Sequence, residues 1–368
     1  MTHTELGYLL CLVRCPSFGP ITLKKLRTSF SSYEELFKAD QKNLCEAGLS
    51  EKGIHHFISL RPKLDPETEF LLLEKHKTQA ITKEDAPYPS LLREIYDPPS
   101  VLFVRGNLPA NNPLFLSVVG TRKPTHYGQQ VVQTLVSELA QNGLIIVSGL
   151  AYGIDALAHE ATCRAKGKTI AVLGSGIDDA TIYPKMHCSL AQKIIETGGA
   201  VMSEFPIGTE PRKHYFPFRN RLIAGMSFGT LIIEAAQKSG SLITAKSALE
   251  SNREVFAVPG PITSPLSVGP NNLLKMGAHV VTDAQDILSF QGLEARPQKK
   301  EALPASIYVP TNNIEATLLE HLTVDPVHID DLVRKTKLDL SLATGQLTLM
   351  EMNGAIRHVG GMYYVKIE

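Results

Sequence analysis

The sequence predicts an α/β protein whose main domain is a doubly wound, mostly parallel sheet. Seven short apolar runs carry this prediction, at residues 115–119, 144–147, 169–173, 200–203, 230–233, 255–258 and 279–281. Strands that are apolar at every position suit burial on both faces, and the helical stretches between these runs would cover a parallel sheet on each side. A further β-branched and aromatic run, at 101–104, is predicted to form an edge strand.

An N-terminal helical domain is predicted at residues 1–75, where Pro16, Gly48 and Gly53 separate short helical patterns. Within it, residues 18–26 resemble a helix-hairpin-helix, whose glycine turn can offer backbone N–H groups to a phosphate. An ordinary packing turn explains the same residues equally well. We therefore describe the domain as SAM/helix-hairpin-helix-like and leave its role open.

The rest of the chain divides into an α/β domain at residues 76–291, a linker at 292–305 and a C-terminal domain at 306–368. The linker is rich in Lys, Glu, Pro and Ala and cannot build a core. Three helical patterns and a glycine-turned hairpin predict that the C-terminal domain is a winged helix. Its recognition helix, expected at 340–351, contains no Arg or Lys, which favours protein contact or regulation over major-groove reading.

The composition excludes several classes of protein. Lys and Arg total 37, as do Asp and Glu, so a uniformly basic surface is excluded and any nucleic-acid site must be a local patch. The five cysteines have no CxxC spacing, which argues against disulfides and structural zinc. No apolar run reaches the roughly 18 residues of a membrane span, and the N-terminus has no basic export signal. We expect a cytoplasmic protein without a membrane segment.

Glycine and small hydroxyl residues follow several of the predicted strands, where ligands bind in open parallel sheets. In the loop at 120–124, Thr121 can hydrogen-bond a phosphate oxygen, Arg122 can grip it with two N–H groups, and Lys123 adds a second charge. Similar turns follow the next two strands, at residues 148–155 and 174–176. A single turn of this kind is weak evidence, but their repetition predicts an anion site at the carboxyl ends of the strands.

Nucleotide cofactors are not expected. The turn at 174–176 lacks the third glycine of a dinucleotide fingerprint, because Asp179 occupies that place. The chain also has no GxxxxGK followed by Ser or Thr, so a Walker-type nucleotidase is not supported.

The densest group of chemically active side chains lies at residues 212–221. It contains four cations and three aromatics without an acidic residue, namely Arg212, Lys213, Arg219 and Arg221 with Tyr215, Phe216 and Phe218. Cations neutralise phosphates and aromatic faces stack unpaired bases, so this pattern predicts contact with single-stranded nucleic acid. The Arg-Asn-Arg segment is expected to open a helix, in which Asn220 could instead hold the loop in place.

A last loop, at 239–241, joins a predicted strand to a helix. The first turn of a helix offers unpaired N–H groups and a partial positive charge, which suit a phosphate. Gly240 and Ser241 are therefore candidate phosphate contacts.

These segments together resemble the DNA processing protein A (DprA/Smf) family. The matching motifs are GTRKPTHYG, SGLAYGIDALAHEA, AVLGSGID followed by YP, SEFPIGTEP, FPFRNRLIAGMS, IIEAAQKSGSLITA and VFAVPGP. The resemblance covers 88–290 and extends to the helical and winged-helix domains in the family's order. It implies an extended Rossmann-like fold that has no catalytic activity, binds single-stranded DNA, forms homodimers and loads the RecA recombinase during natural transformation.

The resemblance also implies which residues contact DNA. The loop after the first parallel strand supplies Thr121 and Arg122, with Lys123 beside them. The basic-aromatic segment and the glycine-serine turn supply Lys213, Phe216, Arg219, Asn220, Arg221, Gly240 and Ser241. Thr121 stands where serine is frequent in the family, and its hydroxyl can make the same hydrogen bond.

Three other functions compete with this interpretation. Nucleotide phosphoribohydrolases share a Gly-Thr-x-x-x-Glu strand, to which Gly229-Thr230 and Glu234 correspond, but the Pro-Gly-Gly that precedes it is absent here. A hydrolase could use Ser148 or Ser175 with His159 and Asp155, which lie four residues apart and would share a helix face. The chain could also act chiefly as an adaptor for a protein partner.

Overall fold

The computed structural model describes residues 1–109, 113–293, 310, 312–323 and 325–366. It divides into two compact units, residues 1–295 and 296–368. Most of the predicted linker lies outside the described residues. None of the described helices is long and apolar enough to cross a bilayer.

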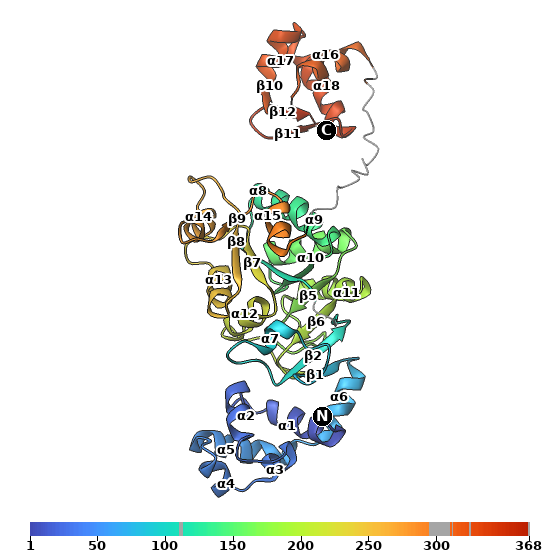
Figure 1. The fold of residues 1–368 in the computed structure, drawn as a ribbon. Helices are drawn as coiled ribbons and strands as arrows, with labels where there is room; N and C mark the ends of the chain where they lie inside the picture. The colour runs from blue at the N-terminus through green and yellow to red at the C-terminus, as the bar shows by residue number, and fades with distance from the viewer. Residues whose placement is uncertain (110–112, 294–309, 311, 324, 367–368) are drawn as a thin grey trace. The chain divides into compact units, whose positions relative to one another are not determined.

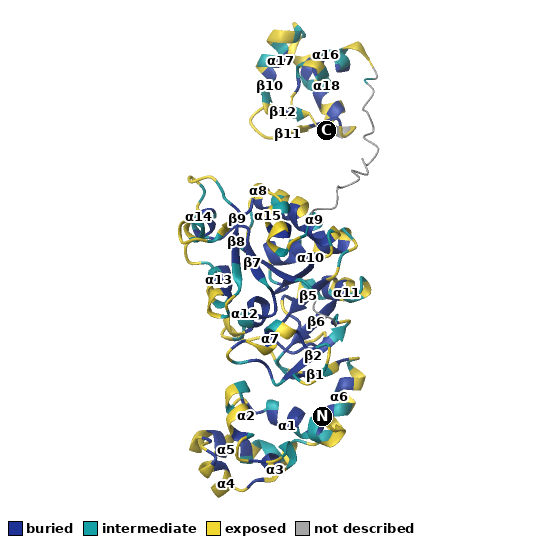
Figure 2. Cartoon of the chain, viewed as in Figure 1, coloured by how far each residue is buried: buried dark blue, intermediate teal, exposed yellow. Residues whose placement is uncertain are grey.

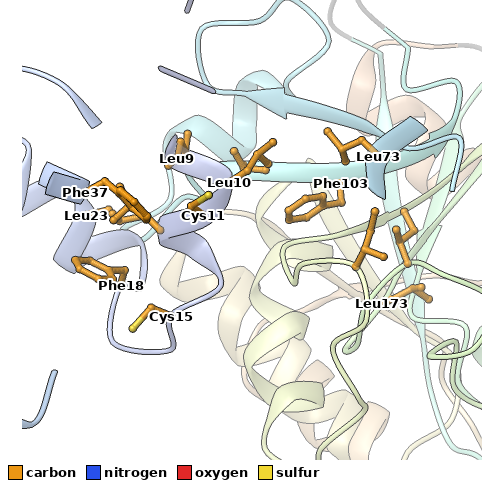
Figure 3. Close-up of a cluster of buried hydrophobic side chains, with 14 of the residues drawn as sticks. Leu9, Leu10, Cys11, Cys15, Phe18, Leu23, Phe37, Leu73, Phe103 and Leu173 are labelled. Carbon is orange, nitrogen blue, oxygen red and sulfur yellow. The ribbon is translucent and has the colours of Figure 1, made fainter. Parts of the chain in front are cut away.

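Six short helices form the N-terminal domain: α1 (His3–Val13), α2 (Pro20–Leu26), α3 (Tyr33–Lys38), α4 (Gln41–Glu46), α5 (Glu51–Leu60) and α6 (Pro66–Lys75). Hydroxyl or carboxylate side chains cap the start of most of them, as Asp65 does for α6. Buried leucines of α1 join a core that continues into the α/β domain through Phe103 and Leu173 (Figure 3). The helical domain is therefore anchored to the α/β domain by shared apolar packing.

The α/β domain contains a nine-stranded sheet in the order β1-β2-β6-β5-β4-β3-β7-β8-β9 (Figure 1). The strands are β1 (Gln79–Thr82), β2 (Val101–Gly106), β3 (Phe115–Val119), β4 (Ile145–Ser148), β5 (Thr169–Val172), β6 (Ala200–Ser203), β7 (Gly229–Ile232), β8 (Glu254–Ala257) and β9 (His279–Val280). From β6 to β9 all neighbours are parallel, which confirms the doubly wound fold.

One prediction about the sheet is wrong, because β2 is not an edge strand. β2 pairs antiparallel with β6 on one side and with β1 on the other. The edge strand β1 was not recognised because its sequence, Gln-Ala-Ile-Thr, buries only the last two residues and lacks an apolar run. These two antiparallel strands extend the parallel sheet beyond β6.

Helices cover both faces of the sheet, and Figure 2 shows the strands buried between exposed outer helix faces. They are α7 (Ser90–Arg93), α8 (His126–Val131), α9 (Ser137–Gln141), α10 (Ile154–Arg164), α11 (Cys188–Glu196), α12 (Tyr215–Gly225), α13 (Gly240–Glu250), α14 (Val268–Lys275) and α15 (Gln285–Leu288). Two apolar clusters include side chains from β3 and β4: Phe115 and Val147 belong to one, and Leu116 and Ile146 to the other. Burial on both faces explains why these strands are continuously apolar.

The strand order reverses at β3. The chain passes from β3 outward through β4, β5 and β6, and then returns to place β7 on the other side of β3. The loops after β3 and β7 therefore run in opposite directions and leave a crevice between them, where open α/β sheets bind ligands.

The C-terminal unit is a winged helix, as predicted. Its helices α16 (Asn313–His321), α17 (Ile329–Thr336) and α18 (Leu340–Met352) pack against strands β10 (Val327–His328), β11 (Ile356–His358) and β12 (Tyr363–Lys366), whose order is β10-β12-β11. The second helix begins only at Ile329, because Val327 and His328 pair with Tyr364 and Tyr363. α18 is the helix expected to contain no Arg or Lys.

Candidate functional site

A cavity of about 470 Å³ lies at the reversal point of the sheet. Five segments supply its lining: the loop after β3, the loop after β4, Tyr183 in the segment after β5, residues 213–220 at the start of α12, and the start of α13 after β7. We call it the switch-point cavity. The candidate residues that line it are Arg122, Lys213, Phe216, Arg219, Asn220, Gly240 and Ser241.

The loop after β3 is held in place by Glu234, which follows β7. The Thr121 N–H donates to the Glu234 carbonyl oxygen at 2.7 Å, and the Thr125 N–H and hydroxyl donate to its carboxylate at 2.9 and 2.5 Å. A Cβ at Gly120 would lie 2.7 Å from Ile154, so only glycine fits there. Glu234 therefore positions Arg122 at the cavity.

Arg122 and Lys213 are exposed, and neither forms an ion pair with any residue that the structure describes. Thr121 and Lys123 lie on the same loop as Arg122 but do not line the cavity. The lining includes one carboxylate, Asp155, and this group is buried beside the Arg219 guanidinium. The cavity therefore presents two uncompensated positive charges.

Arg219 is buried, with 3% of its surface exposed. Its guanidinium donates to the Gly149 carbonyl oxygen at 2.7 Å and to that of Val172, and so ties together the ends of β4 and β5. Burial, opposed by Asp155 and reinforced by Arg122, lowers the pKa of Arg219 to about 10. The prediction that Arg219 lies at the start of a helix is wrong, because α12 begins at Tyr215 and Arg219 lies in its second turn.

Arg221 does not line the switch-point cavity. It forms ion pairs with Glu204 and Asp97 and lies 4.3 Å from the Phe218 ring centroid. Burial, opposed mainly by Arg221, raises the pKa of Glu204 to about 7. These contacts do not support the predicted DNA contact by Arg221 and indicate a structural role. Asn220, by contrast, is half-buried and lines the cavity.

An aromatic surface forms part of the cavity wall. The half-buried Phe216 ring lies 5.5 Å from that of Tyr183, which is 44% exposed. A Cβ at Gly174 would approach Phe216 to 2.9 Å, so glycine at this turn allows the ring to pack closely. Tyr183 was not among the predicted site residues. Its position directly before Pro184, in the Tyr-Pro pair that follows the third glycine turn, was the available signal.

The α13 N-terminus completes the cavity. Ser239 caps the helix, and its hydroxyl lies 2.8 Å from that of Ser241. A Cβ at Gly240 would meet no atom within 4 Å, so the backbone here faces open space. The Ser241 N–H donates to the Ser239 hydroxyl at 3.4 Å and the Leu242 N–H to the Ser239 carbonyl oxygen at 3.2 Å. What this end of the helix offers to an anion is therefore mainly its partial positive charge.

The alternative hydrolase constellation is not assembled by Ser148, Asp155 and His159. The Ser148 hydroxyl donates to the Val118 carbonyl oxygen at 2.7 Å, and the Asp155 carboxylate accepts from the Gly149 N–H at 3.1 Å. His159 is fully buried and its Nδ1 lies 2.7 Å from the Thr169 hydroxyl. Each group is thus occupied by a structural hydrogen bond, and no serine–histidine contact forms.

Comparison with known proteins identifies the family of this chain. Residues 79–292 match the family model of DNA recombination-mediator protein A, and residues 300–362 match that of the DprA winged helix domain. Protein Smf of Escherichia coli is 39% identical over 326 residues, which cover 87% of this chain and 86% of the relative. DNA processing protein DprA of Bacillus subtilis is 46% identical over 210 residues, which cover 57% of this chain and 69% of the relative.

Two solved structures share the fold. The X-ray structure of DNA processing protein A from Streptococcus pneumoniae matches with a TM-score of 0.65 and 36% identity, covering 78% of this chain and 98% of that one. A structure that describes the single-stranded DNA binding mode of DNA processing protein A from Helicobacter pylori matches with a TM-score of 0.51 and 33% identity, covering 58% and 95%. This chain is therefore a member of the DNA processing protein A (DprA) family.

Proposed function

We propose that this protein binds single-stranded DNA in the switch-point cavity and passes it to a RecA recombinase in the cytoplasm during natural transformation. The observation that supports this most strongly is the pairing of two uncompensated cations, Arg122 and Lys213, with the aromatic surface of Phe216 and Tyr183. Cations suit the phosphates of a strand, and exposed rings suit its bases. Stacking on a ring requires an unpaired base, which favours single strands over duplex.

Phosphate contacts are assigned to Arg122, Lys213 and the α13 N-terminus at Gly240 and Ser241. Thr121 and Lys123, which flank Arg122 outside the cavity, would contact the strand where it leaves. Because rings and phosphates carry no base-edge code, little sequence preference is expected. Arg219 would act mainly by holding this surface in shape, whereas Asn220, which lines the cavity, stays a proposed DNA contact.

The homodimer and the recombinase contact are also proposed by analogy with the family. The relatives named DNA processing protein DprA support a role in handling DNA, and the cavity is the proposed DNA site. To pass a strand to a recombinase, the protein must bind DNA without sequence preference and then release it to the recombinase. Light scattering of the purified protein would test the dimer.

The phosphoribohydrolase alternative is disfavoured by Glu234. Its side chain is buried, and both carboxylate oxygens accept hydrogen bonds from Thr125. A carboxylate used in this way is not free to assist the cleavage of a nucleotide. Release of ribose phosphate from a nucleoside monophosphate would nevertheless revive this alternative.

Removing the two cations should weaken DNA binding and reduce its salt dependence. Each phosphate contact to a single strand contributes a slope of about 0.7 in the plot of log affinity against log salt, so Arg122→Ala with Lys213→Ala should lower the slope by about 1.4. Fluorescence anisotropy of labelled single-stranded and double-stranded oligonucleotides at several salt concentrations would measure it. Lys42→Ala, at an exposed lysine of the helical domain, is the control. An unchanged slope would show that the DNA does not bind in the cavity.

Removing the ring of Phe216 should weaken binding without changing the salt slope. A stacked base contributes about 1–3 kcal/mol, so Phe216→Ala should raise Kd by about 5-fold or more, while Phe216→Tyr should retain most of the affinity. The same anisotropy titration measures both variants. Equal losses for alanine and tyrosine would mean that the ring acts in packing rather than in stacking.

Recombinase loading needs a separate measurement. On single-stranded DNA that is already covered by a different single-strand-binding protein, the recombinase filament should grow faster when this protein is added. The increase should be lost when Arg122 and Lys213 are both alanine. A salt-insensitive interaction with the recombinase that survives this double substitution, without DNA binding, would support the adaptor alternative instead.

A further inference from the structure

A second, larger hollow of about 650 Å³ lies between the helical domain and the α/β domain. One wall comes from the turn between α1 and α2, where Figure 3 shows Cys15 and Phe18. The other wall comes from the loop after β6 and from the first turns of α12. We call this hollow the interdomain groove.

The two walls of the groove are fixed relative to each other. Side chains of α1 and of the α/β domain belong to one buried apolar cluster, which includes Leu10 and Phe103. The Arg14 guanidinium, at the end of α1, donates to the Ile207 carbonyl oxygen at 3.1 Å and forms an ion pair with Glu69. The packing and hydrogen bonds within this unit therefore fix the shape of the groove.

Aromatic rings line the α/β wall of the groove. Phe205 and Tyr215 are stacked with their ring centroids 4.3 Å apart, and Phe218 is 41% exposed. Exposed flat rings that are held by packing from behind are suited to stacking on the bases of a single strand.

The buried ion pair behind Phe218 explains its position. Arg221 lies 4.3 Å from the ring centroid and is itself held by Glu204 and Asp97. Glu204 keeps one oxygen, Oε1, without a hydrogen-bond partner among the described residues. Because its pKa is raised to about 7 by burial, Glu204 does not present a full negative charge to a phosphate at neutral pH.

α12 connects the groove to the switch-point cavity. Lys213, Phe216 and Asn220 line the cavity. Tyr215 and Phe218, which lie between them in the sequence, line the groove. The same short segment thus presents one set of side chains to each hollow. A strand bound in the cavity would reach the groove by passing over the first turns of α12.

Cations line a second hollow that adjoins the groove at Ser100. Ser100 lines both the groove and a neighbouring hollow of about 450 Å³, which is also lined by Lys24, Arg27 and Lys83. Burial, and secondarily the charge of Lys24, lowers the pKa of Lys83. Within the described part of the chain neither lysine has an ion-pair partner, and the two repel each other.

Two carboxylates also line this smaller hollow. Glu5 accepts hydrogen bonds from the backbone N–H groups of Tyr33 and Glu34 and is engaged at the start of α3. Glu84 is exposed and partly offsets Lys83. Lys24, Arg27 and Lys83 still outnumber the two acids, which leaves a net positive charge suited to a phosphate.

We propose that the interdomain groove is a second subsite for the same single-stranded DNA. Phe218 and Tyr215 stack bases there, and Lys24 and Lys83 contact the phosphates that follow. The proposal rests on the proposed function, because it assumes that a strand occupies the switch-point cavity. It assigns DNA contact to the helical domain, at the α2 segment that resembles a helix-hairpin-helix.

The first test compares oligonucleotide lengths. Wild-type protein should bind a strand of about 20 nucleotides more tightly than one of about 6, which can fill only one hollow. Lys24→Ala with Lys83→Ala should remove most of this gain and lower the salt slope on the long strand by about 1.4, while leaving the short strand unaffected. The matched control, Lys42→Ala with Lys52→Ala, removes the same charge from exposed sites of the helical domain and should change neither.

The second test locates the bases. Phe218→Tyr keeps a flat ring and should bind the long strand like wild type, whereas Phe218→Leu keeps apolar volume without a ring and should bind it at least 5-fold more weakly. A long strand carrying 5-iodouracil at successive positions should crosslink to the peptide that contains Phe218 at some positions, and a strand of about 6 nucleotides should not.

The outcomes separate this proposal from the proposed function. If wild type binds neither strand, the proposed function fails. If it binds the short strand, and the Lys24 and Lys83 variant keeps the full gain with length, only the second subsite is overturned. An equal loss in the charge-matched control would show that net charge, and not the groove, accounts for the effect.

Discussion

Arg219→Met should destabilise the α/β domain by about 3–5 kcal/mol, the usual cost of removing one partner from a buried, charged network. The substitution takes away the donor for the Gly149 and Val172 carbonyl oxygens and leaves Asp155 buried without a nearby cation. Because burial already raises the pKa of Asp155, losing Arg219 should raise it further. Urea unfolding followed by circular dichroism measures the free energy of unfolding.

A double substitution separates the charge from the hydrogen bonds. Asp155→Asn added to Arg219→Met removes the uncompensated carboxylate, so the pair should cost less than the sum of the two single changes. Arg219→Lys keeps the charge but loses the planar guanidinium and should recover part of the loss. Arg219→Met within 1 kcal/mol of wild type would contradict the role assigned here.

The parallel part of the sheet could be predicted from the sequence because burial on both faces leaves a continuous apolar run, as in β3 and β4. β1 could not, because an edge strand with one buried face is short and mixed in character. The placement of β2 inside the sheet follows from its pairing with β1, which has no local sequence signal.

The candidate site was predicted at the level of segments. The loops after β3 and β7 and the start of α12 converge on one cavity because parallel strands end at one edge of the sheet. The sequence could not show in which direction each side chain of residues 212–221 points. Arg219 and Arg221 look like DNA contacts in the sequence, yet both are held in buried networks.

The groove between domains was beyond the reach of the sequence for a related reason. Its walls come from segments that lie far apart in the sequence, such as those of Phe18 and Phe218, and no local pattern shows that these meet. The helix-hairpin-helix resemblance marked a turn that lines the groove but gave no indication of what packs against it.

His159 should make the protein less stable in acid. Its Nδ1 lies 2.7 Å from the Thr169 hydroxyl, which donates its own proton to the Ile146 carbonyl oxygen, so Nδ1 carries the hydrogen and Nε2 is left bare. Nε2 is buried and has no partner among the described residues. Protonating it would bury a charge without an acceptor, and burial lowers the pKa of His159 to about 3.

The sign of the effect follows from which state binds the proton. Below its ordinary pKa of 6.5, a histidine takes up a proton in the unfolded chain but not in this fold, so stability is present above pH 6.5 and is lost as the pH falls toward 3. The loss between about pH 7 and about pH 5 should be about 2 kcal/mol. Urea unfolding of wild type and His159→Gln at both pH values measures it.

The comparison between the two proteins is needed because Glu204 acts in the opposite direction. Its pKa is raised to about 7 in the fold, so the folded state takes up a proton there first and gains stability as the pH falls. The stability of wild type alone could therefore change little with pH. The difference in the free energy of unfolding between wild type and His159→Gln cancels the contribution of Glu204. This difference should shift by about 2 kcal/mol in favour of the variant at the lower pH. A constant difference would show that the fold does not lower the pKa of His159.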